Sequence, residues 1–324
     1  RKGDAVGTNW AEIANPTYSD PGADLMLLHP DGTEEVLVSG GKGGVTDPVV
    51  SFDGQWVYYS LFHDLTGGTA QQGAPGGADV YKINLQTRQT VRLTTQQFTP
   101  NLGAGDWAAD FRTPAPGRNS LPFGVFNLGP CPLPGGKVMF TSNRNAFKPP
   151  KRLPHVMQLF VMDDDGANVE CVGHLNLGGA LHPTVLRDGR VMFSSLESQG
   201  VRHSILWGLW TIHPDGTNWG PMVSAFMPGP NPTAYHFQTQ LSDGRVVAEE
   251  YYNQTSSGFG SLVAFPPGPP AGRPPFGPGY ADDPRNPPLQ HGRLDERTPR
   301  VRRLPFSPHG IESLTRFARA DEGP

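Results

Sequence analysis

The feature that most constrains the fold of this chain is a short turn that recurs four times between two extended segments. An Asp-Gly or Gly-Gly pair between alternating or apolar runs is the signature of a β-hairpin. The turns fall at Asp53-Gly54, Gly135-Gly136, Asp188-Gly189 and Asp243-Gly244, within "DPVVSFDGQWVYYS", "GPCPLPGGKVMFTS", "HPTVLRDGRVMFSS" and "FQTQLSDGRVVAEE". The sequence therefore predicts four hairpins of one kind.

A second type of hairpin accompanies the first. The four stretches are "ADLMLLHPDGTEEVLVS", "ADVYKINLQTRQTVRLTT", "MQLFVMDDDGANVECVG" and "WGLWTIHPDGTNWGPMV". Two hairpins per unit, at spacings of roughly 50 to 80 residues, predict four-stranded antiparallel blades, and blades arranged radially make an all-β propeller. A β-sandwich is the alternative, but independent hairpins in a sandwich need not repeat this order.

The blades are expected within residues 21–265, which leaves three other segments. Residues 1–20 read as irregular, 266–300 as a Pro/Gly-rich extended loop, and 301–324 as a short helix, from about Gly310 to Ala318, with a tail. The segment "GFGSLVAFP" (258–266) could open a fifth blade. With four to five blades expected and further ones downstream, the propeller reads as incomplete. Its open sheet edges predict that the isolated chain is poorly soluble or oligomeric.

Composition limits the classes of partner. The chain has 324 residues with 41 Gly, 35 Pro, 17% charged residues and a formal net charge of −4. This balance provides no basic surface for nucleic acid. No apolar run approaches the roughly 18 residues of a membrane span. We therefore expect no nucleic-acid partner and no membrane span.

Several long phrases resemble a known family. "NWAEIANPTYSDPGADLMLLHPDG", "LGPCPLPGGKVMFTSNRNAFKPP", "QLFVMDDDGANVECVGHLNLGGALHPTVL" and "LWGLWTIHPDGTNWGPMVSAF" are similar to the middle, propeller domain of the hydrazine synthase alpha subunit family. The blade pattern also resembles the WD40-like repeats of TolB-type propellers. The resemblance implies an extracytoplasmic location and a c-type cytochrome domain or subunit as partner, within a multihaem oxidoreductase.

The chain departs from the full pattern of that family because it contains no C-x-x-C-H motif. It cannot attach a c-type haem itself, so haem is expected only in an adjoining domain. The segment also lacks a G-x-S-x-G elbow and a helical H-E-x-x-H motif. It does not read as a self-sufficient enzyme.

Counting back from each inner turn places one residue of a metal-ligating type on each of the four inner strands, at a similar depth along the central channel of the propeller. They are Asp47, Cys131, His182 and His236. Inner strands of successive blades converge on the axis, so these side chains could meet at one mouth of the channel. Carboxylate, thiolate and imidazole together suit zinc. The family resemblance also implies a zinc near a haem, with a propeller cysteine among its ligands.

Each of these residues has a structural alternative. Cys131, between two prolines, could fill the core, as free cysteines commonly do. His182 could cap a turn or hydrogen-bond a neighbouring loop, and His236 is flanked by aromatic residues that favour packing. His63-Asp64, after a strand end, reads as a solvated loop pair.

Three functions remain open at this point. The first is an extracytoplasmic scaffold that presents a channel-mouth site to a cytochrome. The second is a TolB-type protein-interaction propeller. The third is a metal-dependent enzyme with its site at the channel mouth.

Overall fold

The structure is a computed structural model, in which all regular structure of the described residues is β. It describes residues 17–68, 73–97, 124–145, 156–172, 179–196, 207–223, 225, 234–250, 261–265 and 302–303. The predicted helix near 310–318 and the Pro/Gly-rich segment 266–300 lie outside these residues. No helix in the described part of the chain is long and apolar enough to cross a membrane.

Four four-stranded antiparallel sheets follow one another along the chain, each in simple up-and-down order. The first two sheets contain β3 (Gly44–Val50), β4 (Trp56–Phe62), β5 (Ala78–Asn84), β6 (Thr90–Arg92), β7 (Asn127–Leu133), β8 (Lys137–Ser142), β9 (Gln158–Asp163) and β10 (Glu170–Cys171). The last two contain β11 (Ala180–Val185), β12 (Val191–Leu196), β13 (Trp207–Ile212), β14 (Gly220–Val223), β15 (Tyr235–Gln240), β16 (Val246–Glu250), β17 (Ser261–Phe265) and β18 (Arg302–Arg303).

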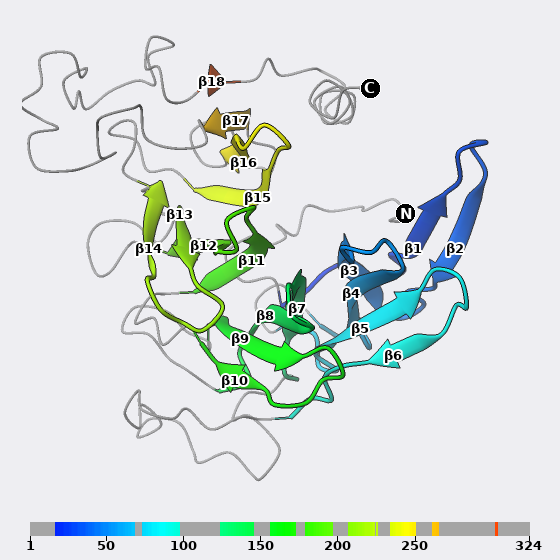
Figure 1. The fold of residues 1–324 in the computed structure, drawn as a ribbon. Helices are drawn as coiled ribbons and strands as arrows, with labels where there is room; N and C mark the ends of the chain where they lie inside the picture. Colours follow the sequence, from blue (N-terminus) through cyan, green and yellow to red (C-terminus); the bar gives the residue numbers. More distant parts are fainter. Residues whose placement is uncertain are drawn as a thin grey trace, which may run out of the picture.

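The four sheets lie along an arc with their first strands toward its centre, and the two-stranded hairpin β1 (Leu25–Leu28) and β2 (Glu34–Val38) stands at one end (Figure 1). Consecutive meander sheets around a common axis are the blades of a β-propeller. The predicted fold class is therefore confirmed. The inner strands begin two or three residues before the positions that the turns suggested, for example at Gly44 and Asn127 rather than near Asp47 and Pro130.

The assignment of strands to blades differs from the prediction at two places. The segment 258–266 does not open a fifth blade, because β17 pairs with β16 as the third strand of the fourth blade. The outer strand of that blade is β18, which pairs with β17 across a long stretch of sequence. The stretch "ADLMLLHPDGTEEVLVS" forms the β1–β2 hairpin, which is a separate two-stranded sheet.

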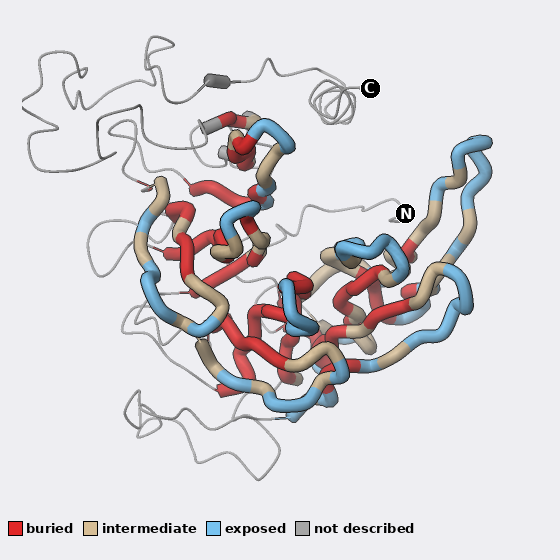
Figure 2. The backbone as a smooth tube through the Cα atoms, viewed as in Figure 1, coloured by how far each residue is buried: buried red, intermediate tan, exposed pale blue. Residues whose placement is uncertain are grey.

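The core lies between neighbouring blades rather than inside any one of them. Strand residues buried on both sides of a blade form successive apolar clusters along the arc (Figure 2). Phe140 and Phe160, for example, are fully buried and stack with ring centroids 5.7 Å apart. Each blade therefore depends on its neighbours for most of its hydrophobic stabilisation.

Candidate functional site at the propeller axis

One backbone feature repeats in the inner strand of every blade. Asp47, Gly129, His182 and Phe237 have φ angles of 53°, 59°, 55° and 52°. Each lies at a register shift between the inner strand and the second strand, which is the mark of a β-bulge. Each also lies six residues before the first residue of the inner turn. We call these four residues the bulge ring.

The bulge ring carries strain in three of its four positions. A left-handed backbone costs an L-residue about 1–2 kcal/mol, and only glycine adopts it freely. A bulky residue such as Phe237 is an outlier in this region. Because strained positions persist only where their surroundings determine them, three non-glycine residues here indicate a selected side-chain arrangement.

Hydrogen bonds between blades hold the ring in place. The Gly129 amide donates to Asp47 Oδ2 and to Ser60 Oγ, both at 3.2 Å. Gln238 Nε2 donates to the His182 carbonyl at 2.5 Å, and Ser194 Oγ donates to the Tyr235 carbonyl at 2.7 Å. These bonds fix the orientation of one inner strand relative to the next.

Two of the predicted site residues come together, because His182 of the bulge ring contacts His236. Their ring centroids are 5.6 Å apart, and Phe237 lies 4.4 Å from His182. Trp207 contacts His236 from the other side at 5.2 Å. This group places imidazole and aromatic rings from the third and fourth blades in direct contact.

Three ring nitrogen atoms of this group are buried without a hydrogen-bond partner in the part of the chain that the structure describes. They are His182 Nε2, His236 Nδ1 and Trp207 Nε1, all shielded from solvent. Burial lowers the pKa of His182, although the charge of Asp47 opposes this effect. Burial also lowers the pKa of His236 well below its usual value, and His182 adds to the decrease. Both imidazoles are therefore neutral at pH 7.

Cys131 lies in a different environment from the bulge ring. It comes two residues after Gly129, pairs with Met139, and packs with Leu159, Ala180 and other apolar residues between the second and third blades. Only 3% of the residue is exposed, and burial raises the thiol pKa to about 12. The thiolate that a metal requires is thus strongly disfavoured.

These surroundings do not fit Cys131 as a zinc ligand. The described residues contain no group of three or more His, Cys, Asp or Glu side chains that could hold a metal ion. Asp47 and His182 belong to the bulge ring and the buried His236 contacts His182, whereas the thiol lies in the interblade core. Zinc binding by the predicted set of four stays a prediction.

Replacement of Cys131 by serine provides the direct test. We expect equal zinc content in wild type and Cys131→Ser, measured by mass spectrometry on the purified protein. We also expect a loss of stability of about 1–3 kcal/mol, because a hydroxyl would be buried among apolar neighbours. Loss of zinc only in Cys131→Ser would show that the thiol is a ligand after all.

Among the described residues, Asp79 is a fully buried carboxylate with several hydrogen-bond partners, and it is not one of the site residues predicted from the sequence. Its Oδ1 accepts from Thr94 Oγ1 at 2.6 Å, and from the Gln96 amide and Asn127 Nδ2. Its Oδ2 accepts from Arg92 at 2.5 Å and lies 2.7 Å from His63 Nε2. Asn127 belongs to the next blade, so this carboxylate joins two blades.

His63 is correspondingly not a solvated loop residue, as its position after a strand end suggested. Its ring contacts the buried Asp79 and is only partly exposed. A signal for this site exists in the sequence: the pair Ala-Asp begins the outer hairpin at both 23–24 and 78–79. In the first copy, Asp24 Oδ1 likewise accepts from the Gly40 amide, at 2.7 Å.

No family model matches the chain. Among solved structures it is similar to TolB from Acinetobacter baumannii, with 14% identity and a TM-score of 0.44 over 74% of this chain and 44% of that one. It is also similar to a nidogen/laminin complex, with 9% identity and a TM-score of 0.49 over 76% and 72% of the two chains. An oligogalacturonate lyase in complex with manganese gives 13% identity and a TM-score of 0.43 over 75% and 55%.

The chain spans less than half of the Acinetobacter TolB chain. At these scores the likenesses add nothing to what the sheet topology shows. That topology defines the class of protein: a β-propeller of four-stranded antiparallel blades.

Proposed function

We propose that this chain is an extracytoplasmic scaffold whose propeller axis presents the bulge ring to a c-type cytochrome domain or subunit. The resemblance of its long phrases to the hydrazine synthase alpha subunit family suggests the cytochrome partner and the compartment. The fold alone does not assign either, since propellers carry many unrelated functions.

The observation that carries this proposal is the fixed and partly exposed bulge ring. Phe237 is 52% exposed although its backbone is strained, and Asp47 and His182 are partly exposed beside it. An exposed aromatic residue held rigidly next to a carboxylate and an imidazole suits contact with another protein surface. Because neighbouring blades lock the ring, docking would require little ordering of these side chains.

Affinity purification tests the proposal. A tagged wild-type protein, isolated from its native source, is expected to carry a c-type haem polypeptide, identified by its visible spectrum and by C-x-x-C-H peptides. Phe237→Asp should retain at least about tenfold less haem, because a charge would face the contact. Trp219→Asp is the matched control, since Trp219 is exposed on an outer strand connection and should leave haem retention unchanged.

Other outcomes distinguish the remaining functions. If the wild-type protein carries a partner without haem, and Phe237→Asp does not carry that partner, the result would favour the TolB-type interaction propeller. Absence of haem from the wild-type protein, or equal haem in wild type and Phe237→Asp, contradicts the proposed docking surface. A metal-dependent activity that disappears in His182→Ala would favour the enzyme instead.

A further inference from the structure

Three polar side chains of the first blade lie between the buried Asp79 carboxylate and solvent. They are His63, Tyr81 and Arg92, and we call them the outer cluster. The side chains of His63 and Arg92 are 27% and 40% exposed, and Tyr81 is half-buried, whereas the side chain of Asp79 is fully buried. A buried carboxylate therefore stands behind an accessible polar surface.

The members of the outer cluster form one continuous surface. His63 Nε2 lies 2.7 Å from Asp79 Oδ2, and Arg92 Nη2 donates to the same oxygen at 2.5 Å. The ring centroid of Tyr81 lies 6.2 Å from that of His63 and 5.8 Å from the guanidinium carbon of Arg92. The strand register agrees with these contacts, because Tyr81 on β5 is directly opposite Arg92 on β6.

Contacts with the rest of the blade fix this surface in advance of any binding. Arg92 Nε donates to the Thr94 carbonyl at 2.8 Å, in addition to the bond to the buried carboxylate. The ring of Tyr81 stacks on the buried ring of Tyr59, with centroids 5.7 Å apart. Side chains that are already ordered lose little conformational freedom when a ligand binds.

The outer cluster has hydrogen-bond donors to spare. An arginine carries five N–H groups, and Asp79 and the Thr94 carbonyl accept from Nη2 and Nε of Arg92. Its Nη1 donates to no residue in the part of the chain that the structure describes. Burial raises the pKa of Tyr81, although Arg92 opposes this effect, so the hydroxyl is a donor at neutral pH. A ligand with acceptor oxygens would satisfy both.

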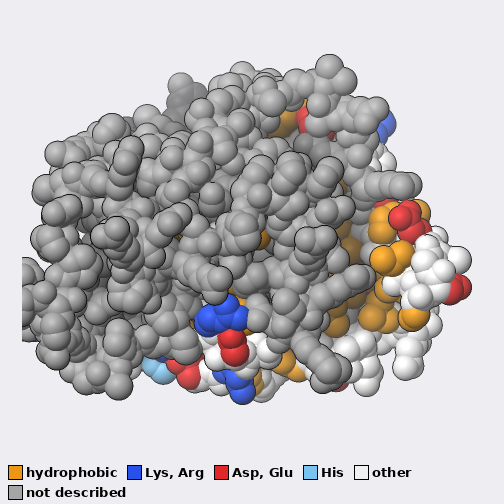
Figure 3. Space-filling model, turned by 90° about the horizontal axis from the view of Figure 1, so that it is seen from above, with side chains coloured by type: hydrophobic (Ala, Val, Ile, Leu, Met, Phe, Trp, Pro, Cys, Tyr) orange, Lys and Arg blue, Asp and Glu red, His pale blue; other side chains and the backbone are white. Residues whose placement is uncertain are grey.

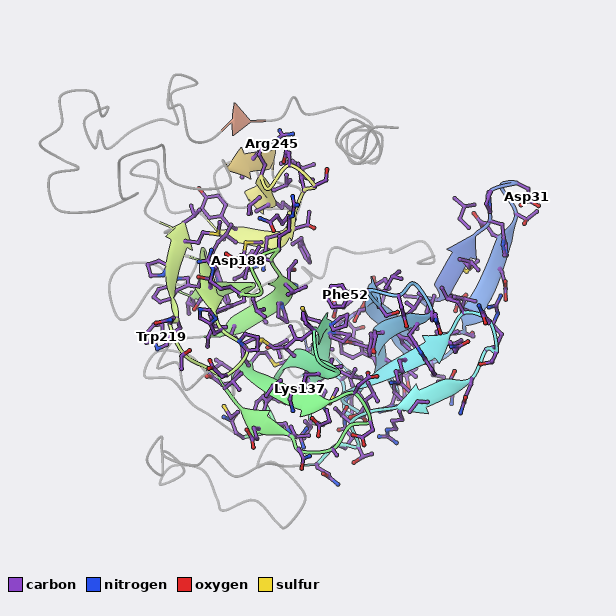
Figure 4. All side chains as sticks on the ribbon, viewed as in Figure 1. Asp31, Phe52, Lys137, Asp188, Trp219 and Arg245 are labelled. Atoms are coloured by element: carbon purple, nitrogen blue, oxygen red, sulfur yellow. The ribbon has the colours of Figure 1, made fainter. Side chains whose placement is uncertain are left out.

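Two other arginines of the chain have a different setting. Arg190 binds Asp188 at 2.6 Å, and both lie at an exposed inner turn. Arg245 binds Asp243 at 2.5 Å at the next inner turn. Figure 4 labels Asp188 and Arg245 at these turns, and Figure 3 shows basic side chains beside acidic ones on the face that it presents. An anion that approached these turns would meet an exposed carboxylate, whereas at the outer cluster the carboxylate is covered.

We propose that the outer cluster binds the carboxylate group of a small ligand, with Arg92 and Tyr81 as donors and His63 beside them. Carboxylate oxygens accept charge-assisted hydrogen bonds from a guanidinium group. Because Asp79 already offsets the charge of Arg92, one negative charge suits the site better than the two of a phosphate dianion. This site is independent of the proposed cytochrome partner, which concerns the bulge ring.

A titration of the purified chain with sodium acetate tests the site. The ring proton signals of His63, followed by NMR at constant pH and ionic strength, should shift saturably with a Kd of about 1–10 mM. Arg92→Lys keeps a charge beside Asp79, and Tyr81→Phe removes only a hydroxyl. Each should raise the Kd at least about threefold, because each removes a donor to a charged group. Arg245→Lys is the matched control and should leave the Kd unchanged.

The conservative variant separates loss of binding from loss of folding. Tyr81→Phe should keep the wild-type Tm within about 2 °C, because the ring and its stacking on Tyr59 remain. A shift that stays linear in acetate, or a wild-type Kd in both Arg92→Lys and Tyr81→Phe, overturns the proposal. Tighter binding of inorganic phosphate than of acetate in the same titration also overturns it, because the site would then not select a single charge.

Discussion

Replacement of Asp79 by alanine is expected to lower the free energy of unfolding by about 3–5 kcal/mol, the loss typical when one partner of a buried charged network is removed. The carboxylate is fully buried and accepts hydrogen bonds from Arg92, at the end of β6, from Thr94, just after β6, and from Asn127 in the next blade. Its removal would leave the fully buried Asn127 amide with only the longer of its two hydrogen bonds, to the Ala78 carbonyl at 3.3 Å, in place of the bond to Asp79 at 2.9 Å. Urea unfolding of wild type and variant measures this difference.

Asp53→Ala is the matched control, because Asp53 is an exposed turn residue that bonds only its local neighbours. It should cost less than about 1 kcal/mol. A loss for Asp79→Ala no greater than that of Asp53→Ala would show that the carboxylate does not join the blades.

Because of the pKa of Asp79, the stability that this network contributes is expected to depend on pH. Although burial alone would raise this pKa, hydrogen bonds from His63, Thr94 and Arg92 outweigh burial and lower it to about 2. A carboxyl whose folded pKa lies below its unfolded value near 3.8 adds stability that is present above that value and is lost as pH falls toward 2. The difference in stability between wild type and Asp79→Ala should therefore shrink between about pH 4 and pH 2.

The paired histidines are expected to make the protein less stable as pH falls below about 6.5, the usual imidazole pKa. Both folded pKa values are lowered, chiefly by burial, so the unfolded chain binds protons that the folded chain excludes. Stability should therefore fall between pH 7.5 and 5.5, and the fully buried His236, whose pKa is lowered well below its usual value, should account for more of the loss than the partly exposed His182. Stability present at neutral pH is thus lost on acidification.

The control is the double variant His182→Gln, His236→Gln, measured with a chelator present so that metal does not contribute. Its stability should vary much less over this range, because glutamine does not titrate. An unchanged dependence on pH in the double variant would mean that other groups are responsible and that the imidazoles are not buried in neutral form.

Local patterns in the sequence predict most of the fold. The inner turns and the alternating runs around them identify the hairpins, because hairpin formation depends on neighbouring residues. The assignment of hairpins to blades depends on contacts between distant residues. This is why β1–β2 read as part of a full unit, and why the return of Arg302–Arg303 to β17 was not anticipated.

The sequence predicts two members of the bulge ring, because their positions follow from their distance to the inner turn. Asp47 and His182 both lie six residues before the inner turn, so counting from the turn places them at one depth. Cys131 and His236 lie at other offsets. A bulge changes which face of a strand each residue occupies, so a shift of one or two positions moves a side chain from the axis into the core. Asp79 was missed because its five partners come from several segments.

The inner strands carry left-handed bulges that set the side chains of the bulge ring. The most direct test of this arrangement is the difference in free energy of unfolding between Phe237→Gly and Phe237→Ala. Both remove the phenyl ring, so their difference reports the backbone. With φ of 52° at this position, glycine should be more stable than alanine by about 1 kcal/mol. In a regular extended strand alanine would be the more stable by about 0.5–1 kcal/mol, and that result would contradict a left-handed bulge at Phe237.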